Sequence, residues 1–186
     1  MNFRTVRFGI LAALTAGALL FSACEQTPAG ADEPVKDFAS VDMTTAEIST
    51  SGLAEHLLTE ITFDDTSLIR MEPAIAESLY NIAGLADSVV SYGSTGATAE
   101  AVLVLHCTSE ENAAAAEAKI DQYRAEMAAV YADYNEPESG KLTNALLSCD
   151  GVYVVFCVSP DTKAAKTAYH GYVTDTVYGP SAASEG

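Results

Sequence analysis

Two segments of this chain are apolar at successive positions, and each leads directly into a helix signal. The first is the run 102–105 within residues 100–107, and the second spans residues 152–158; neither run alternates between polar and apolar side chains. A strand with one wet face shows that alternation, whereas an unbroken apolar run is typical of a strand buried on both faces. We therefore predict that both segments are central strands of one sheet.

Two further strands are predicted beside them, at residues 88–92 and 142–149. Short glycine-containing turns join each to its central neighbour, and Asp150-Gly151 is a pair that tolerates the positive φ of a tight hairpin. Helical patterns cover the other stretches, at residues 53–61, 74–80, 109–134 and 160–176. The predicted fold class is α+β: a four-stranded antiparallel sheet built from two ββα units, with two N-terminal helices.

Local signals predict where the helices begin. Residues 108–111, Thr-Ser-Glu-Glu, have the spacing of a capping box, and Ser159 followed by Pro160 reads as a cap with proline in the first turn. The short helix at 74–80 is expected to bury Ile75 and Leu79 against the sheet, since both are large and apolar.

The two ββα units resemble each other at a spacing of fifty residues. Residues 101–111 align with residues 151–161, with valines, a cysteine and a serine at matching positions. One interpretation is an internal repeat, in which case the helices would cover mainly one face of the sheet. The other is that any junction from strand to helix gives this pattern, and the sequence leaves both open.

The N-terminus has the layout of a bacterial lipoprotein signal. Two arginines precede an apolar run at residues 8–21, and small residues then lead to Cys24. Phe21 occupies the position where such signals usually carry leucine. We predict a signal peptide at 1–23 and lipidation of Cys24, which would anchor the protein on the extracytoplasmic side of the cell membrane. The alternative is an ordinary secreted protein.

Composition sets the remaining organisation. Residues 24–50 are small, polar and acidic and are predicted to be a flexible tether, followed by a single domain at 51–178 and a disordered tail at 179–186. The chain has a net charge of −17, which becomes −19 if the two leader arginines are removed. Such a charge excludes nucleic acid as a partner and leaves the lipid as the expected membrane contact.

Residues with reactive or metal-binding side chains are scattered. No CxxC pair or Ca²⁺-loop spacing occurs, so we expect no metal, no cofactor and no catalytic residue. Acidic pairs such as Asp64-Asp65 are predicted to be solvated charge. The pairing of the remaining cysteines and the oligomeric state stay open. The reactive or metal-binding side chains considered are those of Cys107, Cys149, Cys157, His56, His106 and His170.

The first functional hypothesis is a non-enzymatic binding or sensing module of the cell envelope. Its ligand would be an envelope protein, a peptide or a small molecule, bound on the sheet face left uncovered by helices. The candidate binding residues there are Tyr153, Val155, Leu103 and Leu105. The alternative hypothesis is a small envelope hydrolase that uses a Cys/His pair or a carboxylate site.

A set of short motifs is spread over roughly residues 50–176. They are 79–82, 86–92, 99–102, Arg124, Tyr134, 137–138, 144–145, 151–154 and 158–159. Together these motifs resemble a known family, the largely clostridial, uncharacterised Gram-positive lipoproteins that carry domain of unknown function 4358 (DUF4358). The resemblance implies a secreted, lipid-anchored domain and provides no catalytic residues.

Overall fold

The computed structural model describes residues 47–179 of the chain. The predicted signal peptide, Cys24 and the tail beyond Gly179 lie outside the described residues. The helices and strands are α1 (Thr50–Glu60), β1 (Ile69–Met71), α2 (Pro73–Tyr80), β2 (Ala86–Gly93), β3 (Ala101–Cys107), α3 (Glu110–Ala132), α4 (Glu136–Thr143), β4 (Leu146–Asp150), β5 (Tyr153–Val158) and α5 (Thr162–Tyr178).

The folded domain begins before the predicted boundary at residue 51. Ile48 is only 3% exposed and packs into the core, although it was placed in the tether. Ser49 caps α1, because its side chain accepts a hydrogen bond from the backbone N–H of Gly52 at 3.1 Å. Thr50 is therefore already helical.

The strands form one antiparallel sheet in the order β1-β2-β3-β5-β4. The prediction that β3 and β5 are central strands is confirmed, and almost every residue in both is buried. Within residues 47–179 the sheet has five strands rather than four, because β1 pairs with the end of β2. β1 was not predicted from the sequence, because a strand of only three residues that lies just before a proline shows too short a pattern to recognise.

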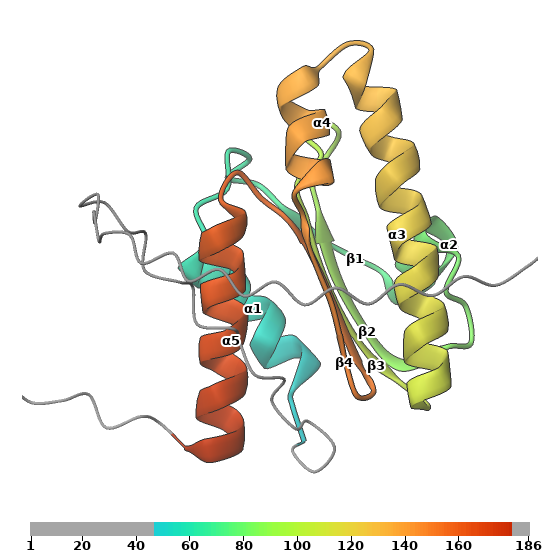
Figure 1. Ribbon diagram of the computed structural model, residues 1–186, viewed down its shortest axis with the longest axis vertical. Helices are drawn as coiled ribbons and strands as arrows, with labels where there is room; N and C mark the ends of the chain where they lie inside the picture. The colour runs from blue at the N-terminus through green and yellow to red at the C-terminus, as the bar shows by residue number, and fades with distance from the viewer. Residues whose placement is uncertain (1–46, 180–186) are drawn as a thin grey trace, which may run out of the picture. The chain divides into compact units, whose positions relative to one another are not determined.

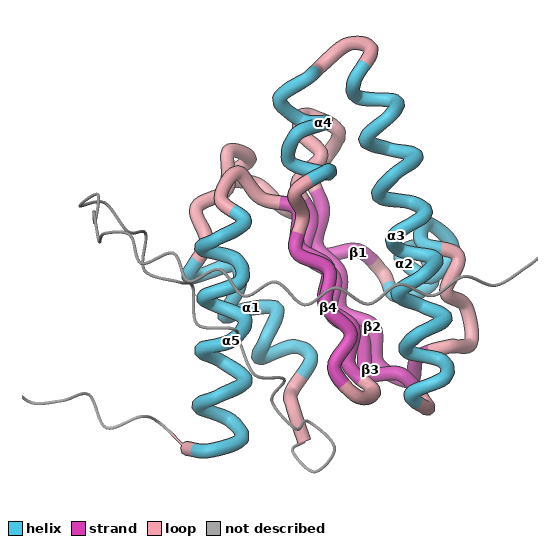
Figure 2. The backbone as a smooth tube through the Cα atoms, in the orientation of Figure 1, coloured by secondary structure: helices cyan, strands magenta, loops and turns pink. Residues whose placement is uncertain are grey.

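Helices cover both faces of this sheet (Figure 1). α1 and α5 pack on one face, and α2, α3 and α4 contribute to the core on the other. Figure 2 shows the same arrangement, with the strands between two groups of helices. The arrangement expected from an internal repeat, in which the helices cover mainly one face, is therefore wrong. β3 and β5 are apolar on both sides because each side packs against a separate hydrophobic core.

The fifty-residue similarity does not correspond to a structural repeat. A two-fold rotation that exchanges the antiparallel neighbours β3 and β5 would run perpendicular to the sheet and would leave both following helices on one face. α3 and α5 instead lie on opposite faces (Figure 1). The two ββα units therefore have opposite handedness, and the similarity reflects the pattern shared by strand-to-helix junctions.

Several predicted element boundaries need correction. The capping-box spacing predicted Thr108 as the cap of α3, but the cap is the next residue, Ser109, which accepts from the N–H of Asn112 at 3.1 Å. The cap of α5 is Asp161 rather than Ser159, and its carboxylate accepts from the N–H of Ala164 at 2.9 Å. The predicted strand at 142–149 begins only at Leu146, because residues 136–143 form the unpredicted helix α4. The hairpin turn shifts by one residue, since Asp150 still pairs with Tyr153.

Candidate functional site

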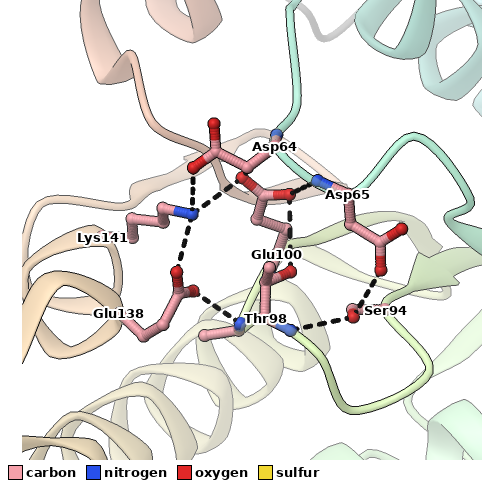
Figure 3. A network of polar contacts seen from close by, with 8 residues as sticks. Asp64, Asp65, Ser94, Thr98, Glu100, Glu138 and Lys141 are labelled. Carbon is pink, nitrogen blue, oxygen red and sulfur yellow. Dashed lines mark hydrogen bonds and ion pairs between the residues drawn. The ribbon is translucent and has the colours of Figure 1, made fainter. Parts of the chain in front are cut away.

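A buried network of charged side chains joins α4 to the start of β3 (Figure 3). The Nζ atom of Lys141 lies 2.8 Å from Glu138, 3.0 Å from Glu100 and 2.7 Å from Asp64. The side chain of Glu100 is completely buried, while those of Lys141 and Glu138 are about a tenth exposed. A buried charge is tolerated only when it is paired in this way.

Glu100 is held by backbone groups as well as by the lysine. Its two carboxylate oxygens accept hydrogen bonds from the backbone N–H groups of Asp64 at 3.0 Å and Asp65 at 2.7 Å. Burial opposes the charged form of Lys141, but its hydrogen bonds to Asp64, Glu138 and Glu100 outweigh this and raise its pKa. The network therefore fixes the α1–β1 connection against β3.

The same network pins the loop between β2 and β3. Glu138 accepts a hydrogen bond from the backbone N–H of Ala99 at 2.7 Å. The hydroxyl of Ser94 donates to Asp65 at 2.6 Å and accepts from the N–H of Thr98 at 3.1 Å. The hydrogen bond from Ser94 lowers the pKa of Asp65. These three hydrogen bonds hold residues 94–99, and the sequence alone did not indicate them.

A cavity of about 220 Å³ lies beside this loop. It sits among β1, α2, α3 and the β2–β3 loop, so the charged network supports one of its walls. The rings of Tyr80 and Tyr123 meet edge to face with centroids 4.8 Å apart. The cavity is lined by Met71, Leu79, Tyr80, Gly93, Ser94, Gly96, Thr98, Ala99, Glu100, Ala101, Tyr123, Met127, Tyr131 and Leu142.

The tyrosines give this cavity an apolar but hydrogen-bonding lining. Burial raises the pKa of Tyr80, and the neighbouring Tyr123 raises it further. Burial also raises the pKa of Tyr123 and of Tyr131. All three phenols therefore remain neutral well above physiological pH, and they offer ring surfaces and hydroxyl groups rather than charge.

The exposed side of α2 forms part of the rim of this cavity. Leu79, which lines it, is 43% exposed, and Ile75 one turn earlier is 58% exposed. The prediction that these two residues are buried is wrong, because Ala76 and Tyr80 face the sheet instead. Sequence spacing identified the helix but assigned its inner face one residue out of phase.

The four binding residues predicted from the sequence do not form a surface. Tyr153 and Val155 are buried in the core beneath α1 and α5, and the hydroxyl of Tyr153 accepts a hydrogen bond from the N–H of Ile48 at 3.0 Å. Leu103 and Leu105 are fully buried in the opposite core. The uncovered sheet face on which that prediction rested does not exist in the described residues.

The surroundings of His106, Cys107 and Cys157 do not favour a Cys/His enzyme. His106 Nδ1 contacts Asp87 Oδ1 at 2.5 Å, and its ring lies beside that of Tyr153. Burial raises the pKa of the Cys107 thiol to about 11 and that of Cys157 to about 12. Such shifts oppose the thiolate that a nucleophilic cysteine requires.

Other features bear on the predicted chemistry of the chain. Cys107, Cys149 and Cys157 are free thiols. Within residues 47–179, no group of three or more His, Cys, Asp or Glu side chains is placed to hold a metal ion. None of the helices in this range is both long enough and apolar enough to cross a membrane.

Part of this chain matches a known protein family. A family model described as "Domain of unknown function (DUF4358)" matches residues 69–159. Residues 69–159 of this chain are therefore a DUF4358 domain. No curated protein and no solved structure matches the chain.

The DUF4358 match defines which part of the fold the family model covers. It begins at the first residue of β1 and ends just after β5, so it includes the whole sheet with α2, α3 and α4. α1 and α5, which cover the other face, lie outside it. Every residue that lines the tyrosine cavity falls inside the DUF4358 range.

Sequence reasoning missed the charged network because its members are far apart in the chain. Asp64 was predicted to be solvated, and its side chain is 63% exposed, but its ion pair with Lys141 was not predicted. Glu100 was taken only as the start of a strand. One signal was available: Glu100 directly precedes a run buried on both faces, where an acid needs a partner. Nothing local identifies Lys141 as that partner.

Proposed function

We propose that this DUF4358 protein is a lipid-anchored, non-enzymatic binding domain on the extracytoplasmic side of the membrane, and that the tyrosine cavity is its ligand site. The observation that carries the proposal is the cavity itself. It is lined by three tyrosines, two methionines and a glycine-containing loop, and it lies wholly within the DUF4358 range. A concave, mainly apolar site with a few polar groups is the usual form of a binding pocket.

The size of the cavity limits what it would hold. Its volume of about 220 Å³ is below the roughly 300–1,000 Å³ of sites for drug-sized ligands. A single aromatic ring, or one side chain of a peptide, has a suitable size. The ring faces of Tyr80, Tyr123 and Tyr131 favour such groups, and they also attract organic cations.

Charge favours a neutral or cationic ligand over an anionic one. Residues 47–179 contain six Lys or Arg and twenty Asp or Glu, a net charge of −14. The one lysine next to the cavity wall, Lys141, already pairs with three carboxylates. An anionic ligand would therefore meet repulsion without a free cation to offset it at this wall.

The pocket can be tested by filling it. Ala99→Leu adds three carbons to a side chain that lines the cavity, whereas Ala97→Leu adds the same carbons to an exposed residue of the same loop. We expect phenol, indole or tetramethylammonium to shift the amide NMR signals of Ala99 and Ala101 in the unaltered protein. Ala99→Leu should weaken binding at least tenfold, and Ala97→Leu should leave it unchanged.

Two results would contradict the pocket. One is that none of the three probes at 10 mM moves those amide signals; the other is that both leucine variants bind equally well. Circular dichroism of each variant would confirm that the added carbons have not unfolded the domain.

The anchor has its own test. The segment ending in Cys24 supports lipidation, because an apolar run, small residues and a cysteine follow one another in the order of a lipoprotein signal. Cells fed an alkyne-bearing fatty acid should label the wild-type protein, and Cys24→Ser should remove the label and release the protein from the membrane fraction. An unlabelled wild-type protein in the culture medium would disprove the proposed location.

A further inference from the structure

The sheet has an edge that no strand of the described residues covers. β4 is the last strand in the order, and it pairs only with β5. An uncovered edge presents backbone N–H and C=O groups that can pair with another extended chain. β4 is five residues long, so a strand added to it would share a ladder of roughly 17 Å at about 3.3 Å per residue.

The hairpin register indicates which backbone groups of β4 point outward. Asp150 and Tyr153 close a two-residue loop, and the closing pair of such a hairpin exchanges both its hydrogen bonds. Pairs then alternate along the strand, so Ser148 directs its N–H toward β5. Leu147 and Cys149 direct theirs away from the sheet, where they are open to a further strand.

A groove runs beside this edge, between β4 and α3. Its volume is about 460 Å³, larger than that of the tyrosine cavity. On the α3 side Ala114 and Ala118 are small and exposed, which leaves room for the side chains of an added strand. The groove is lined by Ala114, Glu117, Ala118, Asp121, Arg124, Thr143, Ala145 and Leu147.

The charges of this groove select the kind of chain that would fit. Glu117 and Asp121 lie on its α3 wall. The one cation there, Arg124, is occupied: it pairs with Asp121 and donates to the carbonyl oxygens of Leu142 and Thr143. A strand with lysine or arginine at alternate positions would bring those side chains to the acidic wall.

Charge also favours a basic partner segment over two other possible occupants of the groove, the terminal segments of this chain and a second copy of the domain. Residues 25–46 of the same chain contain five acids and one lysine, and the C-terminal tail contains one acid and no base. A second copy of the domain would bring another net charge of −14 to the contact. A basic segment of a different protein is therefore the complementary partner.

We propose that the β4 edge and the groove beside α3 bind an extended, basic segment of a partner protein by strand addition. The backbone of that segment would pair with the outward groups of Leu147 and Cys149. Alternate side chains would enter the groove, where basic groups reach Glu117. This site lies at the opposite edge of the sheet from β1 and is separate from the tyrosine cavity.

Amide hydrogen exchange in the full chain tests this directly. The probes are two end-capped heptapeptides, Lys-Val-Lys-Val-Lys-Val-Lys and Glu-Val-Glu-Val-Glu-Val-Glu. We expect the basic peptide to slow exchange at the amides of Leu147 and Cys149 at least tenfold, because these groups become hydrogen-bonded. The amide of Ser148, already paired with β5, should change little. The acidic peptide should have no effect.

A charge reversal provides the matched variant. Glu117→Lys should weaken binding of the basic peptide at least tenfold, whereas Glu126→Lys, an exposed acid on α3 outside the groove, should change it less than twofold. The proposal is overturned if millimolar basic peptide protects neither amide, if the two peptides protect equally, or if the two variants bind alike. Protection that grows with protein concentration without peptide would instead show pairing between copies, and would also overturn it.

Discussion

Replacing Lys141 with methionine should lower the free energy of unfolding by about 3–5 kcal/mol at neutral pH, the usual cost of removing one partner from a buried ion pair. The change leaves the carboxylates of Glu100 and Glu138 buried without a counter-ion, although Glu100 keeps its two backbone donors. Urea denaturation followed by circular dichroism measures the loss. Lys166→Met, at an exposed position of α5, should change stability by less than about 0.5 kcal/mol.

A second substitution separates lost charge pairing from lost packing. In the Lys141→Met background, Glu138→Gln removes one unpaired buried charge, and its amide oxygen can still accept the hydrogen bond from the N–H of Ala99. The double variant should therefore be more stable than Lys141→Met alone, a non-additive result. If the two losses simply add, the network does not act through its charges.

The same network makes a prediction about alkaline pH. The pKa of Lys141 is raised in the folded protein, so its stabilising effect is complete below the unfolded value of about 10.4 and is lost as pH rises through the folded value. The stability difference between the wild type and Lys141→Met should therefore stay constant from pH 7 to about pH 9.5 and shrink only at more alkaline pH. A difference that shrinks already near pH 8 would contradict the raised pKa.

Leu103→Ala should lower the free energy of unfolding by about 2–5 kcal/mol, the cost of deleting a large side chain from a packed core. Leu103 is fully buried on the central strand β3, between β2 and β5, in the core that α2 and α3 cover. The matched control is Ile75→Ala on α2, where the side chain is 58% exposed. That change should cost less than about 0.5 kcal/mol.

This comparison tests the main correction to the sequence-based interpretation. Leu103 was predicted to lie on an uncovered binding face, and Ile75 was predicted to be buried. The structure reverses both assignments. If urea denaturation shows that Leu103→Ala costs as little stability as Ile75→Ala, then Leu103 faces solvent and the helix layer over it is absent.

Local chemistry made much of the fold predictable. The unbroken apolar runs identified β3 and β5 as central strands, because only a strand between two cores can be apolar at every position. The capping pattern located the start of α3 to within one residue, and Ser109 rather than Thr108 is the side-chain acceptor that satisfies a free N–H of the first turn. Short motifs pointed to DUF4358, which the family match confirms.

Long-range packing decided the rest. The face that α5 covers depends on how its junction with β5 crosses the sheet, and the sequence of that junction resembles the one before α3 closely enough to suggest a repeat. The ion pair between Asp64 and Lys141 joins residues 77 positions apart. No periodicity or cap encodes such a contact, because it forms only when the sheet has brought the two segments together.

The candidate sites follow the same division. Sequence patterns could predict strands and caps, and they are the basis of the proposed lipoprotein leader, since each is a property of neighbouring residues. The tyrosine cavity and the groove beside β4 arise where residues of several elements converge, at distances in the chain that no local pattern spans. Burial of the four predicted binding residues has the same origin: one helix layer from the two ends of the domain, α1 and α5, and one from its middle, α2, α3 and α4, close over the sheet.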